Sequence, residues 1–147
     1  MERALEHELI VRVGGNILSP LGMSTEATLQ AVLNGESALR RYEGYWNLPE
    51  PFVASLLDFE AIDRIWTARY GAERRANYTD FERIAILSAS FALEEAGIRP
   101  ESDRVLFILS TTKGNVVLLE SDNRLREEVL PDWSARRIAA FFHLSLI

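Results

Sequence analysis

The sequence of 147 residues contains no cysteine, which excludes disulfides, thiolate metal sites and thiol nucleophiles within it. It has only two histidines, His7 and His143, and they lie near opposite ends of the chain. A histidine-based metal site or a Ser-His pair would require the two ends to meet. We therefore expect no metal or cofactor site.

Clustered positive charge is also missing. The chain has 16 basic and 22 acidic residues, for a formal net charge of −6, and the basic residues occur as isolated pairs such as Arg40-Arg41 and Arg136-Arg137. Nucleic acid requires a clustered positive face. No apolar run approaches the roughly 20 residues of a membrane span, and the first residues lack the basic region of a signal peptide. We expect a cytoplasmic protein without a nucleic-acid or membrane partner.

A hydrophobic content of 48% is enough to build one compact domain, and we find no internal repeat or linker. Residues 9–13, "LIVRV", predict a buried strand followed by a structured loop. Ser24 is the expected N-cap of a helix that Asn34-Gly35 ends, and its apolar stripe consists of Leu29, Val32 and Leu33. Together they form a strand-loop-helix unit.

The next stretch carries weaker signals. Residues 36–52 are aromatic and broken by proline, which favours a loop, and 53–57 could form a short strand before a short helix over 60–69. Asp58, Glu60 and Asp63 could be a paired-carboxylate site. We interpret them as the start of that helix, where acidic side chains oppose the helix dipole.

The strongest helix signal begins at Thr79, which forms a capping box with Glu82 and precedes a helix ending at Gly97. Its middle, "IAILSASFAL" (84–93), is apolar or small on nearly every face. Such a helix is buried all round, which indicates packing on at least two sides, as between two sheets.

A second apolar strand is expected over 104–109, followed by a polar bend, a helix within 116–129 and a last helix with Ser134 as its N-cap. Phe141-Phe142 beside Ile138 would be an exposed apolar surface if the fold is incomplete. The apolar ending "HLSLI" indicates a chain that has been cut off.

The polar bend is the main candidate site. The bend is not a Walker loop, because the single glycine of the bend follows the lysine instead of preceding it. A dinucleotide fingerprint is excluded as well, because Gly14, Gly15 and Gly22 have the wrong spacing for it. The bend is either a plain strand-to-helix corner or a loop lining a pocket at the carboxyl end of a parallel strand. Lys113, the only lysine among the 16 basic residues, is expected to be solvated. The six residues are Ser110, Thr111, Thr112, Lys113, Gly114 and Asn115.

Three motifs in series resemble the β-ketoacyl-[acyl carrier protein] synthases of the thiolase-like fold. The opening "VRVGGNILSPLGMSTEATLQAVLNGES" is similar to their first strand, G-x-x-S-P-x-G turn and first helix. "YTDFERIAILSASFALEEAGI" is similar to the helix that ends A-L-x-x-A-G-I/L. "DRVLFILSTTKGN" occupies the place of the strand that ends in their G-S-G-x-G-G loop. The order and spacing agree across residues 9–143.

The resemblance implies an α/β fold, the N-terminal half of a thiolase-like αβαβα architecture, with a mixed or mostly parallel sheet flanked by helices. Residues 1–147 would be a single partial domain that ends before the nucleophilic cysteine of the family. The full-length form would condense an acyl thioester with malonyl carrier protein by decarboxylation, in fatty-acid or polyketide-type synthesis. Its partner would be acyl carrier protein, no catalytic residue can be assigned within these residues, and the bend would border the acyl pocket.

The sequence leaves three readings open. The first is an inactive N-terminal portion of a 3-oxoacyl-[acyl carrier protein] synthase. The second is a non-catalytic partner or chain-length-type homologue; the bulkier "STTKGN" in place of the glycine-rich loop is compatible with such a partner or with a divergent subfamily. The third is a small Rossmann-like ligand-binding domain. An incomplete half fold would leave apolar surface to cover, so we also expect a homodimer.

Overall fold

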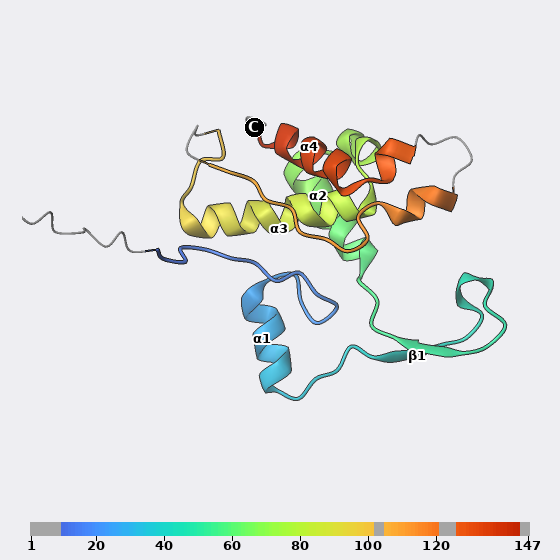
Figure 1. Cartoon of the computed structure of the whole chain (residues 1–147). Helices are drawn as coiled ribbons and strands as arrows, with labels where there is room; N and C mark the ends of the chain where they lie inside the picture. The colour runs from blue at the N-terminus through green and yellow to red at the C-terminus, as the bar shows by residue number, and fades with distance from the viewer. Residues whose placement is uncertain (1–9, 102–104, 121–125, 145–147) are drawn as a thin grey trace, which may run out of the picture.

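The computed structural model describes residues 10–101, 105–120 and 126–144, and these residues form a small mixed α/β protein (Figure 1). Within these ranges the helices α2, α3 and α4 pack together, and the β-hairpin and α1 project from them. The α-helices and strands are α1 (Thr25–Leu33), β1 (Arg40–Tyr42), β2 (Phe52–Ala54), α2 (Phe59–Tyr70), α3 (Asp80–Ala96) and α4 (Pro131–Phe141). The 3-10 helices are η1 (Tyr45–Asn47), η2 (Ala72–Asn77), η3 (Val116–Glu120) and η4 (Arg126–Val129).

α1 has the bounds that its caps predict. The hydroxyl of Ser24 accepts a hydrogen bond of 3.2 Å from the backbone N–H of Ala27, and the helix ends at Asn34 before Gly35, whose φ is +72°. Its apolar stripe nevertheless lies open to solvent. The buried residues of α1 are Thr28 and Ala31, whereas the three stripe residues Leu29, Val32 and Leu33 are exposed.

α3 is the central element of the fold, and its ends confirm the prediction for its sequence. The hydroxyl of Thr79 accepts from the backbone N–H of Glu82, whose side chain accepts from the backbone N–H of Thr79, and Gly97 ends the helix at a φ of +65°. Every described residue from 81 to 93 is buried or half-buried. Most of these side chains are half-buried, so the all-round burial that the uniformly apolar sequence indicated is confirmed in part. The expected packing between two sheets is not found among the described residues.

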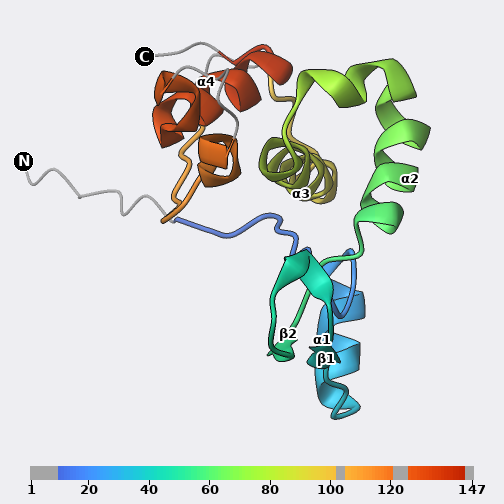
Figure 2. The same ribbon diagram turned by 90° about the vertical axis from the view of Figure 1, so that its right-hand side faces the viewer.

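The hydrophobic core lies where α2, α3 and α4 meet (Figure 2). α2 begins after its N-cap Asp58, which accepts a 2.9 Å hydrogen bond from the backbone N–H of Ala61, so the expected short helix is confirmed. The cluster of buried apolar side chains consists of Ile62, Trp66, Ile86, Leu87, Ile138 and Phe142.

The loop predicted over 36–52 is wrong in part, because residues on both sides of Gly44 pair as an antiparallel hairpin. Arg40 lies opposite Ala54 and Tyr42 opposite Phe52, so the strand expected at 53–57 begins one residue earlier. Tyr42 stacks on Phe52 with ring centroids 5.5 Å apart. Aromatic pairs across the strands stabilise the hairpin, although the polar and proline-containing sequence by itself favours a loop.

The described residues of the two predicted apolar strands are not part of a sheet. Residues 10–13 and Val105–Leu109 are extended, but no backbone hydrogen bond pairs them with another described segment; the rest of each predicted strand, residues 9 and 104, lies outside the described residues. The sheet of the described residues is the two-stranded antiparallel hairpin β1-β2. The mixed or mostly parallel sheet is therefore not found there, because a strand needs a neighbouring backbone that the described residues do not provide.

The C-terminal region also differs from the prediction. The expected helix within 116–129 is replaced by η3 and η4, and residues 121–125 lie outside the described part. α4 begins four residues earlier than expected, with Leu130 as N-cap and Pro131 at its first position, where a missing N–H costs nothing. Ser134 is a buried residue inside the helix rather than its cap.

The expected apolar surface on α4 is wrong. Ile138 and Phe142 are buried in the core cluster, and Phe141 packs edge-on against Tyr70 with ring centroids 4.9 Å apart. The last helix thus covers α2 and α3 instead of exposing its aromatic side chains.

Candidate functional site

The polar bend follows the extended segment Val105–Leu109 and turns the chain toward α4. The hydroxyl of Thr111 accepts hydrogen bonds from the backbone N–H groups of Lys113 and Gly114, at 3.3 and 3.0 Å, and Gly114 has a φ of +55°. Ser110, Thr112 and Lys113 are exposed, and the side chain of Lys113 has no hydrogen-bond or ion-pair partner among the described residues. The bend is therefore a hydroxyl-stabilised turn with a solvated lysine at its tip.

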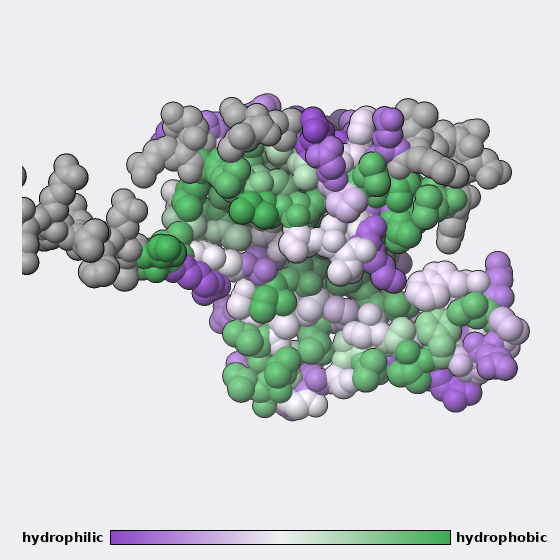
Figure 3. Space-filling model, in the orientation of Figure 1, coloured by the Kyte–Doolittle hydropathy of each residue, from purple (hydrophilic) through white to green (hydrophobic). Residues whose placement is uncertain are grey.

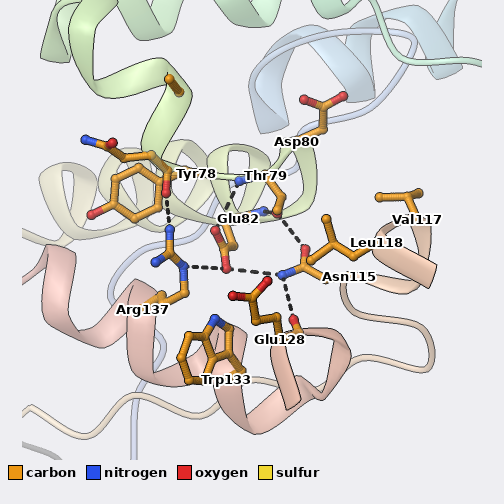
Figure 4. Close-up of a pocket in the computed structure, with 12 residues that line it drawn as sticks. Tyr78, Thr79, Asp80, Glu82, Asn115, Val117, Leu118, Glu128, Trp133 and Arg137 are labelled. Atoms are coloured by element: carbon orange, nitrogen blue, oxygen red, sulfur yellow. Dashed lines mark hydrogen bonds and ion pairs between the residues drawn. The ribbon is translucent and has the colours of Figure 1, made fainter. Parts of the chain in front are cut away.

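Asn115 ends the bend and is almost fully buried, with 1% of its surface exposed. Its amide nitrogen donates to Oε1 of Glu82 at 3.1 Å and to the hydroxyl of Ser134 at 2.9 Å, and its amide oxygen accepts from the Thr79 hydroxyl at 2.5 Å (Figure 4). One side chain thus joins the end of the bend to the N-terminus of α3 and to α4.

Glu82 is the charged centre of this network. Its Oε1 also accepts from Nε of Arg137 at 3.0 Å, and its Oε2 accepts from the backbone N–H of Thr79 at 3.1 Å. Arg137 reaches the carbonyl oxygen of Asn77 and lies over the Tyr78 ring, 5.1 Å from its centroid. A buried carboxylate is tolerated when it is paired and hydrogen-bonded in this way.

A cavity of about 420 Å³ opens beside this network. Its lining is mixed: Glu82 pairs with Arg137, the acids Asp80 and Glu128 also line the cavity, and Tyr78 and Trp133 add aromatic surface (Figure 4). The hydroxyl of Thr79 is already donated to Asn115 and Glu82 is held by three donors. The described lining therefore holds polar groups in fixed positions but supplies no activated nucleophile.

Only Asn115 of the six bend residues lines this cavity. The sequence identified Glu82 as a capping residue but revealed neither its pairing with Arg137 nor the contact of Asn115 with Ser134. Glu82 and Arg137 are 55 positions apart in the chain, and Asn115 and Ser134 are 19 positions apart. No local sequence pattern encodes either contact.

The acids of α2 act as the sequence indicated. Asp58 caps the helix and Glu60 lies in its first turn. Asp63 instead accepts from Nε of Arg75 at 2.9 Å and from the buried guanidinium of Arg83. The hydrogen bond from Arg75 is the main cause that lowers the pKa of Asp63 below its ordinary value, with Arg83 acting in the same direction against partial desolvation.

The remaining candidates do not converge on a site. His143 is exposed just beyond α4 at a φ of +56°, and His7 lies outside the described residues. No group of three or more His, Asp or Glu side chains in the described part of the chain could hold a metal ion. No helix there is both long and apolar enough to cross a membrane.

A second hollow, which we name the α3 groove, lies between the two unpaired extended segments. Its volume is about 260 Å³, its floor is formed by Ala89, Ala92 and Ala96 of α3, and none of its lining residues is charged. Residues 13–14 form one wall and 105–107 the other. The α3 groove is therefore apolar, whereas the cavity beside Glu82 is lined by polar and charged side chains.

Both extended segments run antiparallel to α3. A Cβ added to Gly14 would meet Ala92 and Ala96 near the end of the helix, whereas Asn16 hydrogen-bonds Ser88 nearer its start. Val105 lies beside the same end of α3, and Asn115 reaches Glu82 at its start. The two segments therefore run parallel to each other along one helix, as Figure 1 shows.

Comparison with known proteins adds no relative: no protein-family model, curated protein or solved structure matches this chain.

Proposed function

We propose that this chain is the N-terminal portion of a protein related to the β-ketoacyl-[acyl carrier protein] synthases, and that it supplies half of a thiolase-like fold. The parent protein would join an acyl thioester to malonyl carrier protein with loss of carbon dioxide. The proposal rests on the three motifs in series within residues 9–143 and on one structural observation, the parallel course of two apolar extended segments along α3.

That observation has a simple physical meaning. In an α/β fold, a helix that follows one strand and precedes a parallel one runs antiparallel to both and packs on the sheet they form. Residues 10–13 and Val105–Leu109 have this relation to α3, although no hydrogen bonds join them. Residues 81–93 of α3 are buried or half-buried, which favours the buried position that such a helix has in a layered fold.

The exposed stripe of α1 supports the same proposal. Leu29, Val32 and Leu33 follow helical spacing, yet all three are exposed in the described structure. A helix with an amphipathic sequence gains its stability from a covered apolar face. The stripe is therefore expected to pack against a part of the parent fold that the described residues do not provide.

The chain by itself is expected to be inactive. The family uses a cysteine nucleophile and the sequence has none, while the described cavity holds no activated substitute. We would incubate the chain with acyl and malonyl carrier proteins and analyse the products by mass spectrometry. No 3-oxoacyl carrier protein should form, and turnover above a blank without protein would overturn this part of the proposal.

A non-catalytic partner of an active synthase is the second candidate. It is favoured by the bend, whose bulky side chains occupy the place of a glycine-rich loop and whose Asn115 is locked by three side-chain partners. Reading the gene beyond codon 147 separates the two. A cysteine soon downstream, followed later by two histidines or by a histidine and an asparagine, supports the enzyme, and their absence supports the partner.

A further inference from the structure

A third hollow, which we name the arginine hollow, lies where the C-terminal ends of α2, α3 and α4 meet. Its volume is about 450 Å³, within the range of about 300 to 1,000 Å³ that is typical of small-molecule sites. Asn115 of the polar bend reaches Glu82 at the start of α3, whereas the arginine hollow includes Gly97 at the end of that helix. The hollow is therefore separate from the cavity beside Glu82.

The inner lining of the arginine hollow is aromatic. Tyr70 and Phe141 meet edge-on with ring centroids 4.9 Å apart, and the buried Phe142 lies beside them. The polar groups among these rings are already paired. The hydroxyl of Ser90 donates to the carbonyl oxygen of Ile86 at 2.8 Å and accepts from the hydroxyl of Tyr70 at 2.6 Å. This part of the hollow therefore suits the apolar body of a ligand.

Arginine side chains dominate the outer lining. Arg74 and Arg99 are exposed, and neither side chain has a hydrogen-bond or ion-pair partner among the described residues. Arg69 also lines the hollow but is paired with Glu94, and Glu101 is the other acid of the lining. Because Arg69 and Glu94 neutralise each other, two guanidinium groups remain against one carboxylate. The hollow therefore carries a net positive charge.

This local charge is opposite in sign to that of the whole chain, whose formal net charge is −6. In such a protein a small anion is held only where positive groups gather. Guanidinium groups bind a carboxylate or a phosphate through paired N–H donors. The long stems of Arg74 and Arg99 allow both to reach one anionic group, and His143, which also lines the hollow, adds positive charge when it is protonated.

We propose that the arginine hollow binds a small organic anion. Arg74 and Arg99 hold its carboxylate or phosphate group, and its apolar body packs against Tyr70, Phe141 and Phe142. Both parts of the ligand are needed, because ion pairs at exposed arginines contribute little by themselves. This inference goes beyond the proposed function and does not rest on it, since it follows from the lining of the hollow alone.

Isothermal titration calorimetry of the intact 147-residue chain with 3-phenylpropionate tests the proposal. A second titration with 2-phenylethyl phosphate distinguishes a carboxylate from a phosphate ligand. The uncharged 3-phenylpropionamide controls for adsorption of the ring alone. This control is needed because Figure 3 shows hydrophobic atoms gathered over the part of the surface that the extended segments cross in Figure 1, where a ring can also adsorb.

Arg74→Gln and Arg99→Gln, singly and together, remove the two unpaired guanidinium groups. Arg64→Gln is the matched control, because Arg64 is exposed on α2, has no ion-pair partner among the described residues and does not line the arginine hollow. All three arginines are exposed, so none of these substitutions opens a hole in the core. Circular dichroism and urea unfolding establish that each variant is folded.

We expect at least one of the two anions to bind saturably, with one ligand per chain. Each single variant should raise its dissociation constant at least about threefold and the double variant at least about tenfold, while Arg64→Gln leaves it unchanged. The amide should bind at least about tenfold more weakly than the anion. Absence of saturable binding by both anions overturns the proposal, as does an amide that binds equally well or an Arg64→Gln chain that is weakened as much as Arg74→Gln.

A second experiment uses the unmodified sequence. Phenylglyoxal reacts with exposed arginine side chains, and peptide mass spectrometry locates each product. A saturating concentration of the tighter-binding anion should slow the reaction of Arg74 and Arg99 and leave that of Arg64 at its ligand-free rate. Equal protection of all three arginines, or protection of none, would contradict binding in the arginine hollow.

Discussion

The side-chain amide of Asn115 donates a hydrogen bond of 3.1 Å to the buried carboxylate of Glu82, 33 residues earlier in the chain. This contact ties the polar bend to the first turn of α3 and brings Ser134 of α4 into the same network. Burial of a charged group needs such partners, because an unpaired carboxylate loses its hydration without compensation. The network therefore fixes the position of the bend.

Asn115→Ala removes three side-chain hydrogen bonds and leaves the polar groups of Glu82 and Ser134 with fewer partners. We expect the free energy of unfolding to fall by about 2 to 3 kcal/mol. Lys113→Ala, in the same bend but solvated, should change it by less than about 0.5 kcal/mol. Urea unfolding followed by tryptophan fluorescence measures both, and equal losses would show that the network does not anchor the bend.

Asp63→Asn tests the ion pairs with Arg75 and Arg83. The pKa of Asp63 is lowered in the folded chain, so the ionised carboxylate stabilises the fold above its ordinary pKa of 3.8. That contribution is lost as the pH falls through 3.8 toward the lower pKa of the folded state. The stability difference between wild type and Asp63→Asn should be largest near neutral pH and vanish in strong acid.

Asp132→Asn is the control, because Asp132 pairs with Arg136 in an exposed ion pair four residues apart on α4. Exposed pairs of this kind contribute little, so its stability should follow the wild type over the same pH range. Urea midpoints measured at a series of pH values compare the three chains. A difference for Asp63→Asn that persists unchanged in acid would contradict the assigned direction of the pKa.

Gly14→Ala tests the close approach of the N-terminal segment to α3. An added Cβ would lie 2.5 Å from the carbonyl oxygen of Ala92 and 2.9 Å from the Cβ of Ala96, so the segment must move away. We expect a loss of about 1 to 3 kcal/mol in the free energy of unfolding. Gly15→Ala should cost less than about 0.5 kcal/mol, because its Cβ meets only the flexible end of Arg12.

Leu33→Gln tests whether the α1 stripe is uncovered. Leu33 is exposed, so the substitution should change the free energy of unfolding by less than about 0.5 kcal/mol. Ile86→Ala in the buried core should lower it by about 2 to 5 kcal/mol. A loss above 1 kcal/mol for Leu33→Gln, on the order of a buried methylene, would mean that the stripe is covered in this chain.

The elements that the sequence predicts correctly are those whose ends are determined by neighbouring residues. Ser24 and the Thr79-Glu82 capping box set the starts of α1 and α3, and Gly97 set the end of α3. These signals are local, because a cap bonds to a backbone group two or three residues away. The predicted start of α4 at Ser134 is wrong, because Pro131 already occupies the first helical position.

The elements and contacts that the sequence does not predict depend on residues far apart in the chain. The apolar runs at 9–13 and 104–109 predicted strands, but a strand forms only against another backbone, and the described residues offer none. The hairpin of β1 and β2 depends on aromatic contacts between the two strands. The proline and charged residues of this stretch favour a loop, so the sequence pattern does not predict these contacts. The Glu82–Arg137 pair joins two helices and has no local signature.

The central claim is that residues 10–13 and 105–109 run parallel to each other along α3, as two strands of a layered fold would. Cross-linking within one chain tests it most directly, because the sequence has no cysteine of its own. A short bis-maleimide should join Val13→Cys to Leu106→Cys efficiently, since both residues line the α3 groove, and should join Leu33→Cys to Leu106→Cys poorly, since Leu33 does not line it. Equal cross-linking of the two pairs in a dilute chain would contradict the claim.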